Sequence, residues 1–93
     1  MRVLLESIIH FQSEEDFNKS TSLVFSELNK EEVFKALEQW WCPGEHDTNW
    51  YDAKDIDTNF LGYRYKAHDE EFLISLNEGL VIGLSRIIKF KDN

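Results

Sequence analysis

Cys42, His46 and Asp47 lie close together in the sequence and have side chains capable of nucleophilic or metal chemistry. A catalytic cysteine needs a histidine held within hydrogen-bond distance, usually by the fold. The Cys-x-x-x-His spacing falls in a segment without helical or strand periodicity, and such a segment fixes no geometry. We therefore interpret Cys42 as a small buried residue at the end of a helix.

Histidines and carboxylates offer a second chemistry, the binding of a divalent metal ion. His46 with Asp47 and His68 with Asp69 could hold one ion if their two segments met in the fold. The histidines lack the i, i+4 spacing of a helical metal site, and no phosphate-binding glycine loop or Gly-x-Ser-x-Gly motif is present. No feature isolates a catalytic pair of carboxylates. The sequence therefore favours a protein that is not an enzyme and uses no cofactor.

Segment 40–57 concentrates side chains that suit protein binding instead. The three tryptophans stand at positions 40, 41 and 50, and residues 38–57 carry six acids and one base, for a net charge of −5. Trp and Tyr are enriched at the energetic centres of protein interfaces, and spaced carboxylates can imitate the phosphates of a nucleic acid. Trp40, in contrast, fits the core-facing side of an amphipathic helix. The candidate partner-binding residues are Glu45, Asp47, Trp50, Tyr51, Asp52, Asp55 and Asp57, extended by Asp69 and Glu70 if the turn at 67–71 lies nearby.

The overall charge indicates the class of partner. The chain carries 18 acids and 10 bases, for a net charge of −8. Such a charge speeds encounter with cationic molecules and opposes direct binding to nucleic acid or to an anionic membrane. We therefore expect a basic protein as the partner.

Length and composition predict one globular domain over residues 1–93, because single cores stop growing only at roughly 250–300 residues. One cysteine permits no internal disulfide and suits a reducing compartment. Glu6 and His10 interrupt the apolar start of the chain, so no signal peptide is expected, and no apolar run reaches the ~18 residues of a membrane-spanning helix. The predicted location is the cytoplasm.

The first third of the chain predicts a strand followed by a short helix. Residues 3–11 are rich in β-branched and aromatic types, and Ser13 precedes three acids, as at the start of a helix. The helical pattern fades after about one turn. Residues 21–27 then have the composition of a strand, although one continuous helix over 13–28 would also place its apolar residues on one face.

The clearest helix is predicted over residues 30–41. Asn29 can cap it, an apolar stripe runs along one face, and Pro43 and Gly44 end it. Residues 42–57 after the helix are predicted to form a long connection that lies over one edge or face of the sheet.

Alternation of apolar and polar residues predicts three strands near 61–67, 72–76 and 80–90, joined by a polar turn at 68–70 and a glycine-containing turn at 77–79. The pair Ile87-Ile88 breaks the alternation and indicates a bulge. The predicted fold is α+β, with an antiparallel sheet of four to five strands that ends in this meander and packs against the main helix. A last strand at the sheet edge would permit a weak homodimer beside the monomer.

In length, charge and fold class, and in the segment Trp50-Tyr51-Asp52 followed by Asp55 and Asp57, the chain resembles the small acidic immunity proteins that bacteria make against toxins, including those of contact-dependent growth inhibition. The resemblance implies one-to-one binding of a cognate basic toxin domain, often a nuclease, and no catalytic residues. Two alternatives remain open. One is a phage-encoded acidic inhibitor of a host nucleic-acid-binding protein, and the other is a small metal-dependent enzyme.

Overall fold

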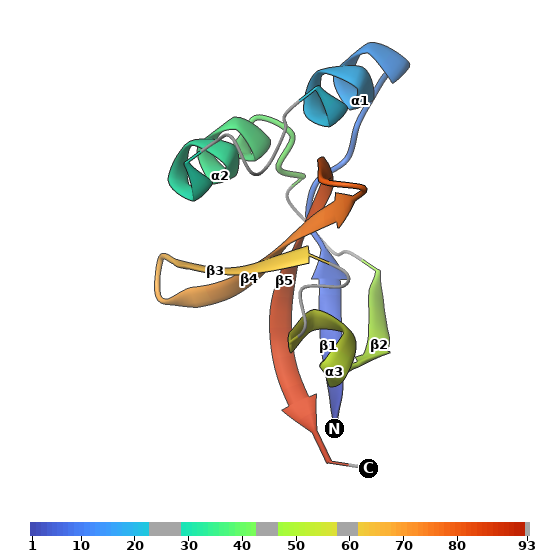
Figure 1. Ribbon diagram of the computed structural model, residues 1–93, viewed down its shortest axis with the longest axis vertical. Coiled ribbons are helices and arrows are strands. Elements are labelled where there is room, and N and C mark those ends of the chain that lie inside the picture. Colours follow the sequence, from blue (N-terminus) through green and yellow to red (C-terminus); the bar gives the residue numbers. More distant parts are fainter. Residues whose placement is uncertain (23–28, 43–46, 58–61, 93) are drawn as a thin grey trace.

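The computed structural model describes residues 1–22, 29–42, 47–57 and 62–92 and has an α+β fold (Figure 1). Its five strands form one antiparallel sheet in the order β2-β1-β5-β4-β3. The elements in chain order are β1 (Arg2–Ser7), α1 (Glu14–Thr21), α2 (Lys30–Glu38), β2 (Thr48–Asp52), α3 (Ala53–Asp57), β3 (Gly62–Ala67), β4 (Glu70–Asn77) and β5 (Leu80–Lys91). The predicted fold class and the C-terminal meander are confirmed.

Two tight turns join the strands of the meander. His68 and Asp69 have φ angles of 53° and 60°, and Glu78 and Gly79 have φ angles of 52° and 80°. Positive φ at both central residues matches the right-handed twist of the flanking strands. Three of these four residues, His68, Asp69 and Glu78, are not glycine, although their positive φ angles favour glycine.

Helix α1 begins where the sequence predicted it, because the hydroxyl of Ser13 accepts a hydrogen bond from the backbone N–H of Asp16 at 3.1 Å. It runs for eight residues, longer than the predicted single turn, and ends at Thr21. The continuous helix over 13–28 is therefore wrong. The alternative strand over 21–27 is wrong at Thr21, and residues 23–28 lie outside the described part of the chain.

Helix α2 begins at the predicted cap, since the side-chain oxygen of Asn29 accepts a hydrogen bond from the N–H of Glu31 at 2.8 Å. The helix ends at Glu38, short of the predicted 41. Trp40 and Trp41 lie beyond it, and Trp41 forms an isolated β-bridge with Ile9. Pairing with the chain after β1 thus replaces the last predicted turn of helix. Pro43 and Gly44 lie outside the described residues.

Two apolar clusters hold the layers together. One contains the buried side chains of α2 (Val33, Phe34 and Leu37) with Trp40, and it includes residues of β4 and β5. The other lies around α3, where Ile56 packs with buried residues of β1, β4 and β5. Helix α1 is joined to β5 by the buried hydroxyl of Ser20, which donates a hydrogen bond to the carbonyl of Val81 at 2.8 Å. Helices therefore cover the sheet in two separate places (Figure 1).

Two sequence-based predictions about the sheet are wrong. Segment 40–57 is not one long connection, because residues 48–52 form β2 and residues 53–57 form α3. An edge strand with mostly exposed side chains needs no apolar alternation, which is why the pattern did not reveal β2. Strand β5 is not an edge, since it lies between β1 and β4. The predicted bulge is confirmed, as the β1–β5 register shifts between Ile87 and Lys89.

Candidate functional site: two acidic surfaces

Strand β2 places the predicted binding residues on two different sides of the sheet. Trp50 stands opposite Leu4 of β1, and Tyr51 stands opposite Val3. Successive side chains of a strand point to opposite faces. Trp50 and Tyr51 therefore cannot both contact one flat surface of a partner.

Trp50 is half-buried and is surrounded by cations of its own chain. The guanidinium of Arg2 lies 5.3 Å from the centre of its ring, and the ammonium of Lys89 lies 5.8 Å away. Such cation–π contacts stabilise the indole where it is. The negative field that the sequence suggested around this ring is thus locally offset by Arg2 and Lys89.

Tyr51, Asp52 and Asp55 form what we call the β2–α3 corner. Tyr51 is 40% exposed, and the next residue, Asp52, is also exposed. One oxygen of Asp52 accepts a hydrogen bond from the N–H of Lys54 at 3.1 Å, and the other lies 3.8 Å from the Lys54 ammonium. The corner therefore projects a ring and carboxylates, one of which is already near a cation.

Other predicted residues lie apart from this corner. Asp47 is exposed, but it precedes the opposite end of β2, about 17 Å away at ~3.4 Å per residue. Glu45 lies outside the described residues, and the structure describes the backbone of Asp57 but not its side chain. Asp69 and Glu70 lie three strands away from β2, a separation of about 14 Å from strand spacing alone. The predicted residues thus do not form one patch.

A hollow forms where β4 and β5 diverge, and we call it the β4–β5 groove. Their pairing ends at Phe72 and Arg86, and beyond that point β5 continues with β1 as its partner. Figure 1 shows the β3–β4 hairpin turning away from the lower half of β5. The hollow has a volume of about 520 Å³ and is lined by residues 69–71 on one wall and residues 86–90 on the other.

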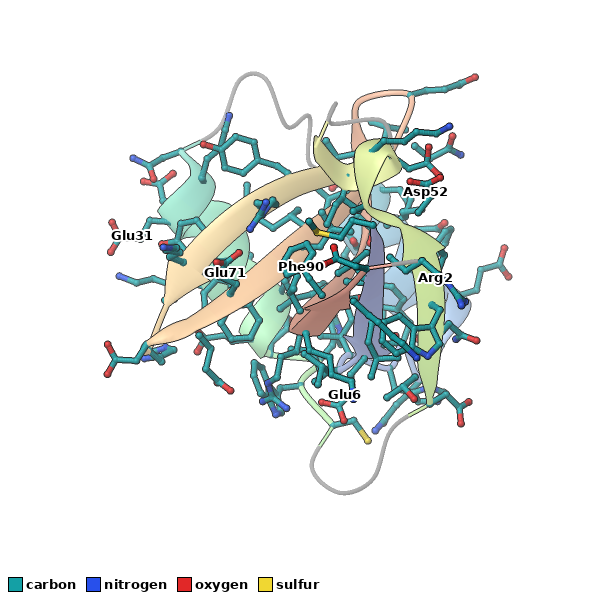
Figure 2. All side chains as sticks on the ribbon, turned by 90° about the horizontal axis from the view of Figure 1, so that it is seen from below. Arg2, Glu6, Glu31, Asp52, Glu71 and Phe90 are labelled. Carbon is teal, nitrogen blue, oxygen red and sulfur yellow. The ribbon has the colours of Figure 1, made fainter. Side chains whose placement is uncertain are left out.

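The groove combines apolar side chains with charged ones of both signs, since Arg86 and Lys89 also line it. Asp69, Glu70 and Glu71 are three consecutive acids on its hairpin wall. On the β5 wall, the side chains of Ile88 and Phe90 are 43% and 38% exposed. Figure 2 labels Glu71 and Phe90, which lie on the two walls. Of the predicted site residues, only Asp69 and Glu70 belong to this groove. The sequence reasoning missed Phe90, although the break in alternation at 87–88 was a signal that the end of β5 differs from its start.

Arg86 ties the groove to the rest of the sheet. Its Nη1 donates a hydrogen bond to the carboxylate of Glu6 at 2.7 Å, and its Nε lies 3.1 Å from the carboxylate of Glu70. The second contact is close but not aligned as a hydrogen bond, so Nε is buried without a hydrogen-bonding acceptor. The guanidinium also lies 5.4 Å from the ring centre of Trp41. Arg86 on β5 therefore links β1, β4 and the chain after α2.

On the hairpin wall, Glu71 pairs with Arg64 of β3, and the guanidinium of Arg64 lies 5.2 Å from the ring centre of Phe90. The same arginine therefore touches both walls of the groove. This part of the groove is therefore already filled by a cationic side chain of the chain itself.

The groups with catalytic or metal-binding chemistry are placed differently. Cys42 is half-buried, less covered than the sequence predicted, and lines a hollow of about 310 Å³ with His10 and Asp16. His46 lies outside the described residues. Within residues 1–22, 29–42, 47–57 and 62–92, no group of three or more His, Cys, Asp and Glu side chains is arranged to hold a metal ion. In the same residues no helix is long and apolar enough to cross a bilayer.

Comparison with known proteins adds no name to this geometry. Neither the models of known protein families, nor the curated proteins, nor the solved structures gave a match to the chain.

Proposed function

We propose that this chain is an inhibitory binding protein of the immunity type that neutralises a basic protein, most simply a toxin nuclease domain. The observation that carries the proposal is the β4–β5 groove, whose walls contain Asp69, Glu70 and Glu71 on one side and the exposed Ile88 and Phe90 on the other. Lys and Arg side chains of a partner would meet the carboxylates, and an apolar group would cover the Phe90 ring. The net charge of −8 would speed the encounter.

The two surfaces have different roles in this proposal. A hollow can enclose a side chain and exclude water from its contacts, which strengthens charge-assisted hydrogen bonds. The β2–α3 corner is exposed and its Asp52 carboxylate lies near Lys54, so in this proposal it contributes to steering more than to affinity. The groove therefore supplies most of the binding free energy.

The test is inhibition of a basic toxin domain, taken from a gene adjacent to the one that encodes this chain. Inhibition of toxin activity and the dissociation constant by calorimetry are measured for the native chain and for three double variants. The groove variant is Asp69→Asn with Phe90→Ala. The corner variant is Tyr51→Ala with Asp52→Asn. The control is Glu14→Gln with Phe17→Ala on α1, which removes one carboxylate and one ring that is 41% exposed.

We expect the groove variant to weaken binding at least tenfold, because loss of an anchoring aromatic side chain costs about 1–2 kcal/mol or more. The corner variant should weaken binding less than fivefold, and the control less than twofold. A native chain that inhibits no basic domain would overturn the proposed function. A groove variant that binds as tightly as the native chain would show that the site lies elsewhere.

A further inference from the structure

We infer that the β4–β5 groove receives an extended strand of the basic partner, which adds to the open side of β5. The inference rests on the proposed function and specifies how the partner is held. Strand addition to a sheet edge is a common way for proteins to bind peptides, with affinity from backbone hydrogen bonds and specificity from side-chain pockets.

The backbone of β1 sets the orientation of its neighbours. The N–H of Ser7 donates to the carbonyl of Asp47, and the N–H of Ala53 donates to the carbonyl of Met1. Backbone groups alternate in direction along an antiparallel strand. The backbone N–H and C=O groups of the odd-numbered residues of β1 therefore point toward β2, and those of the even-numbered residues point toward β5. The bond from the N–H of Ile8 to the carbonyl of Leu84 agrees with this assignment.

The same alternation leaves the backbone of Phe90 directed into the groove. Leu4 pairs with Lys89, and Arg2 pairs with Lys91, so the backbone groups of Lys89 and Lys91 point toward β1. Phe90 lies between them and points its N–H and C=O away from β1. On that side the pairing with β4 has already ended at Arg86. The groove thus offers a strand partner both a donor and an acceptor.

The walls of the groove identify the chemistry of the incoming strand. Glu70 and Glu71 already lie against Arg86 and Arg64, so Asp69 is the acid of this wall that would attract a cationic side chain of the partner, and Ile88 and Phe90 offer apolar surface. Side chains of a strand alternate between two faces, so a segment that alternates cationic and apolar residues would match both kinds of contact. The occupant is therefore an extended basic segment of the partner and not a helix.

Strand β2 is the other place where a strand could add, because the backbone groups of Thr48 and Trp50 point away from β1 by the same alternation. The groove is favoured because a strand there meets β5 on one side and the acidic hairpin wall on the other. The two positions are distinguishable by proline substitution.

The experiment uses the whole chain and three synthetic probes. The first probe is an eight-residue peptide of alternating lysine and valine. The second is the same peptide N-methylated at alternate residues, which keeps its charge but blocks strand pairing. The third alternates glutamate and valine. On the protein, Phe90→Pro removes the ring and the N–H, whereas Phe90→Ala removes only the ring, and Thr48→Pro removes an outward N–H of β2. Affinity is measured by NMR titration, and folding of each variant is checked by circular dichroism.

We expect the lysine-valine peptide to bind at least tenfold more tightly than its N-methylated form and than the glutamate-valine peptide. Phe90→Pro should bind at least threefold more weakly than Phe90→Ala, and Thr48→Pro should bind as the native chain does. Equal binding of the N-methylated peptide would overturn strand addition, and this comparison decides the matter even if Phe90→Pro does not fold. A loss of binding confined to Thr48→Pro would also overturn the inference and move the strand to β2.

Toxin inhibition separates this inference from the proposed function. If Phe90→Pro and Phe90→Ala inhibit the toxin domain equally, and both more weakly than the native chain, strand addition is wrong while inhibition through the groove stands. If the native chain inhibits no basic domain, the proposed function is wrong whatever the peptides do.

Discussion

The β2–α3 corner and the β4–β5 groove contain similar side chains in different geometry. Each offers carboxylates and one partly exposed ring, Tyr51 at 40% and Phe90 at 38%. In the corner the ring and its neighbours are successive residues of an edge strand, and strand alternation sends Trp50 to the opposite face. In the groove, residues from the start of β4 and the end of β5 face one another. Strand alternation separates the neighbouring side chains of β2, whereas the divergence of β4 and β5 places side chains from distant parts of the chain around one hollow.

The largest expected effect comes from Gly62, which begins β3 and helps to position the hairpin wall of the groove. A Cβ added there would lie 2.1 Å from the carbonyl oxygen of Ile74, so the backbone must move. Gly62→Ala should lower the free energy of unfolding by about 2–3 kcal/mol. Urea unfolding measures the change. It should also impair the groove more than the corner, since β3 lies at the sheet edge and pairs with β4.

Gly83→Ala is the matched control, because it is also a strand glycine beside β4. Its Cβ would meet the side chain of Ser75 at 3.7 Å, an ordinary contact. The unfolding free energy should change by less than about 1 kcal/mol. Equal losses for the two variants would mean that the tight approach of Gly62 to β4 does not support the hairpin.

A smaller effect is expected from Arg86→Met. This change keeps much of the side-chain volume but leaves the carboxylates of Glu6 and Glu70 without their shared cation. The side chains of Arg86 and Glu6 are only 27% and 17% exposed, so we expect a loss of about 1–2 kcal/mol in urea unfolding. Arg64→Met breaks the more exposed pair with Glu71 and should cost less than about 1 kcal/mol. The reverse order would contradict the role of Arg86 as the link between strands.

The smallest expected change in stability comes from two glycine substitutions, which should differ in their effect on binding. Asp69→Gly and Glu78→Gly each place glycine where φ is positive, at 60° and 52°, and each removes one negative charge. Both should raise the unfolding free energy by about 0.5 kcal/mol, because glycine accepts this backbone conformation. Only Asp69 lines the groove, so only Asp69→Gly should weaken binding of the basic partner. Equal binding by the two variants would remove Asp69 from the site.

Local features of this fold were predictable from the sequence. The caps at Ser13 and Asn29, the turn at Glu78–Gly79 and the bulge at 87–88 each depend on a few neighbouring residues. The alternation of the last three strands likewise reports a short-range property, the face on which each side chain lies. Trp40 was correctly placed in the core, because it continues the apolar stripe of α2.

The candidate site depended on contacts that no local pattern contains. β1 pairs with β5 at a sequence separation of some 80 residues, through pairs such as Glu6 with Arg86, and this pairing makes β5 central and carries its last residues past the end of β4. Strand β2 escaped prediction because one row of hydrogen bonds to β1 holds it at the edge with little apolar burial. The sequence alone thus determined the two helix caps, the strands of the meander and the acidic charge. Tertiary structure alone decided which carboxylates share a hollow, since backbone pairing between distant strands, and not proximity along the chain, sets the distances between side chains.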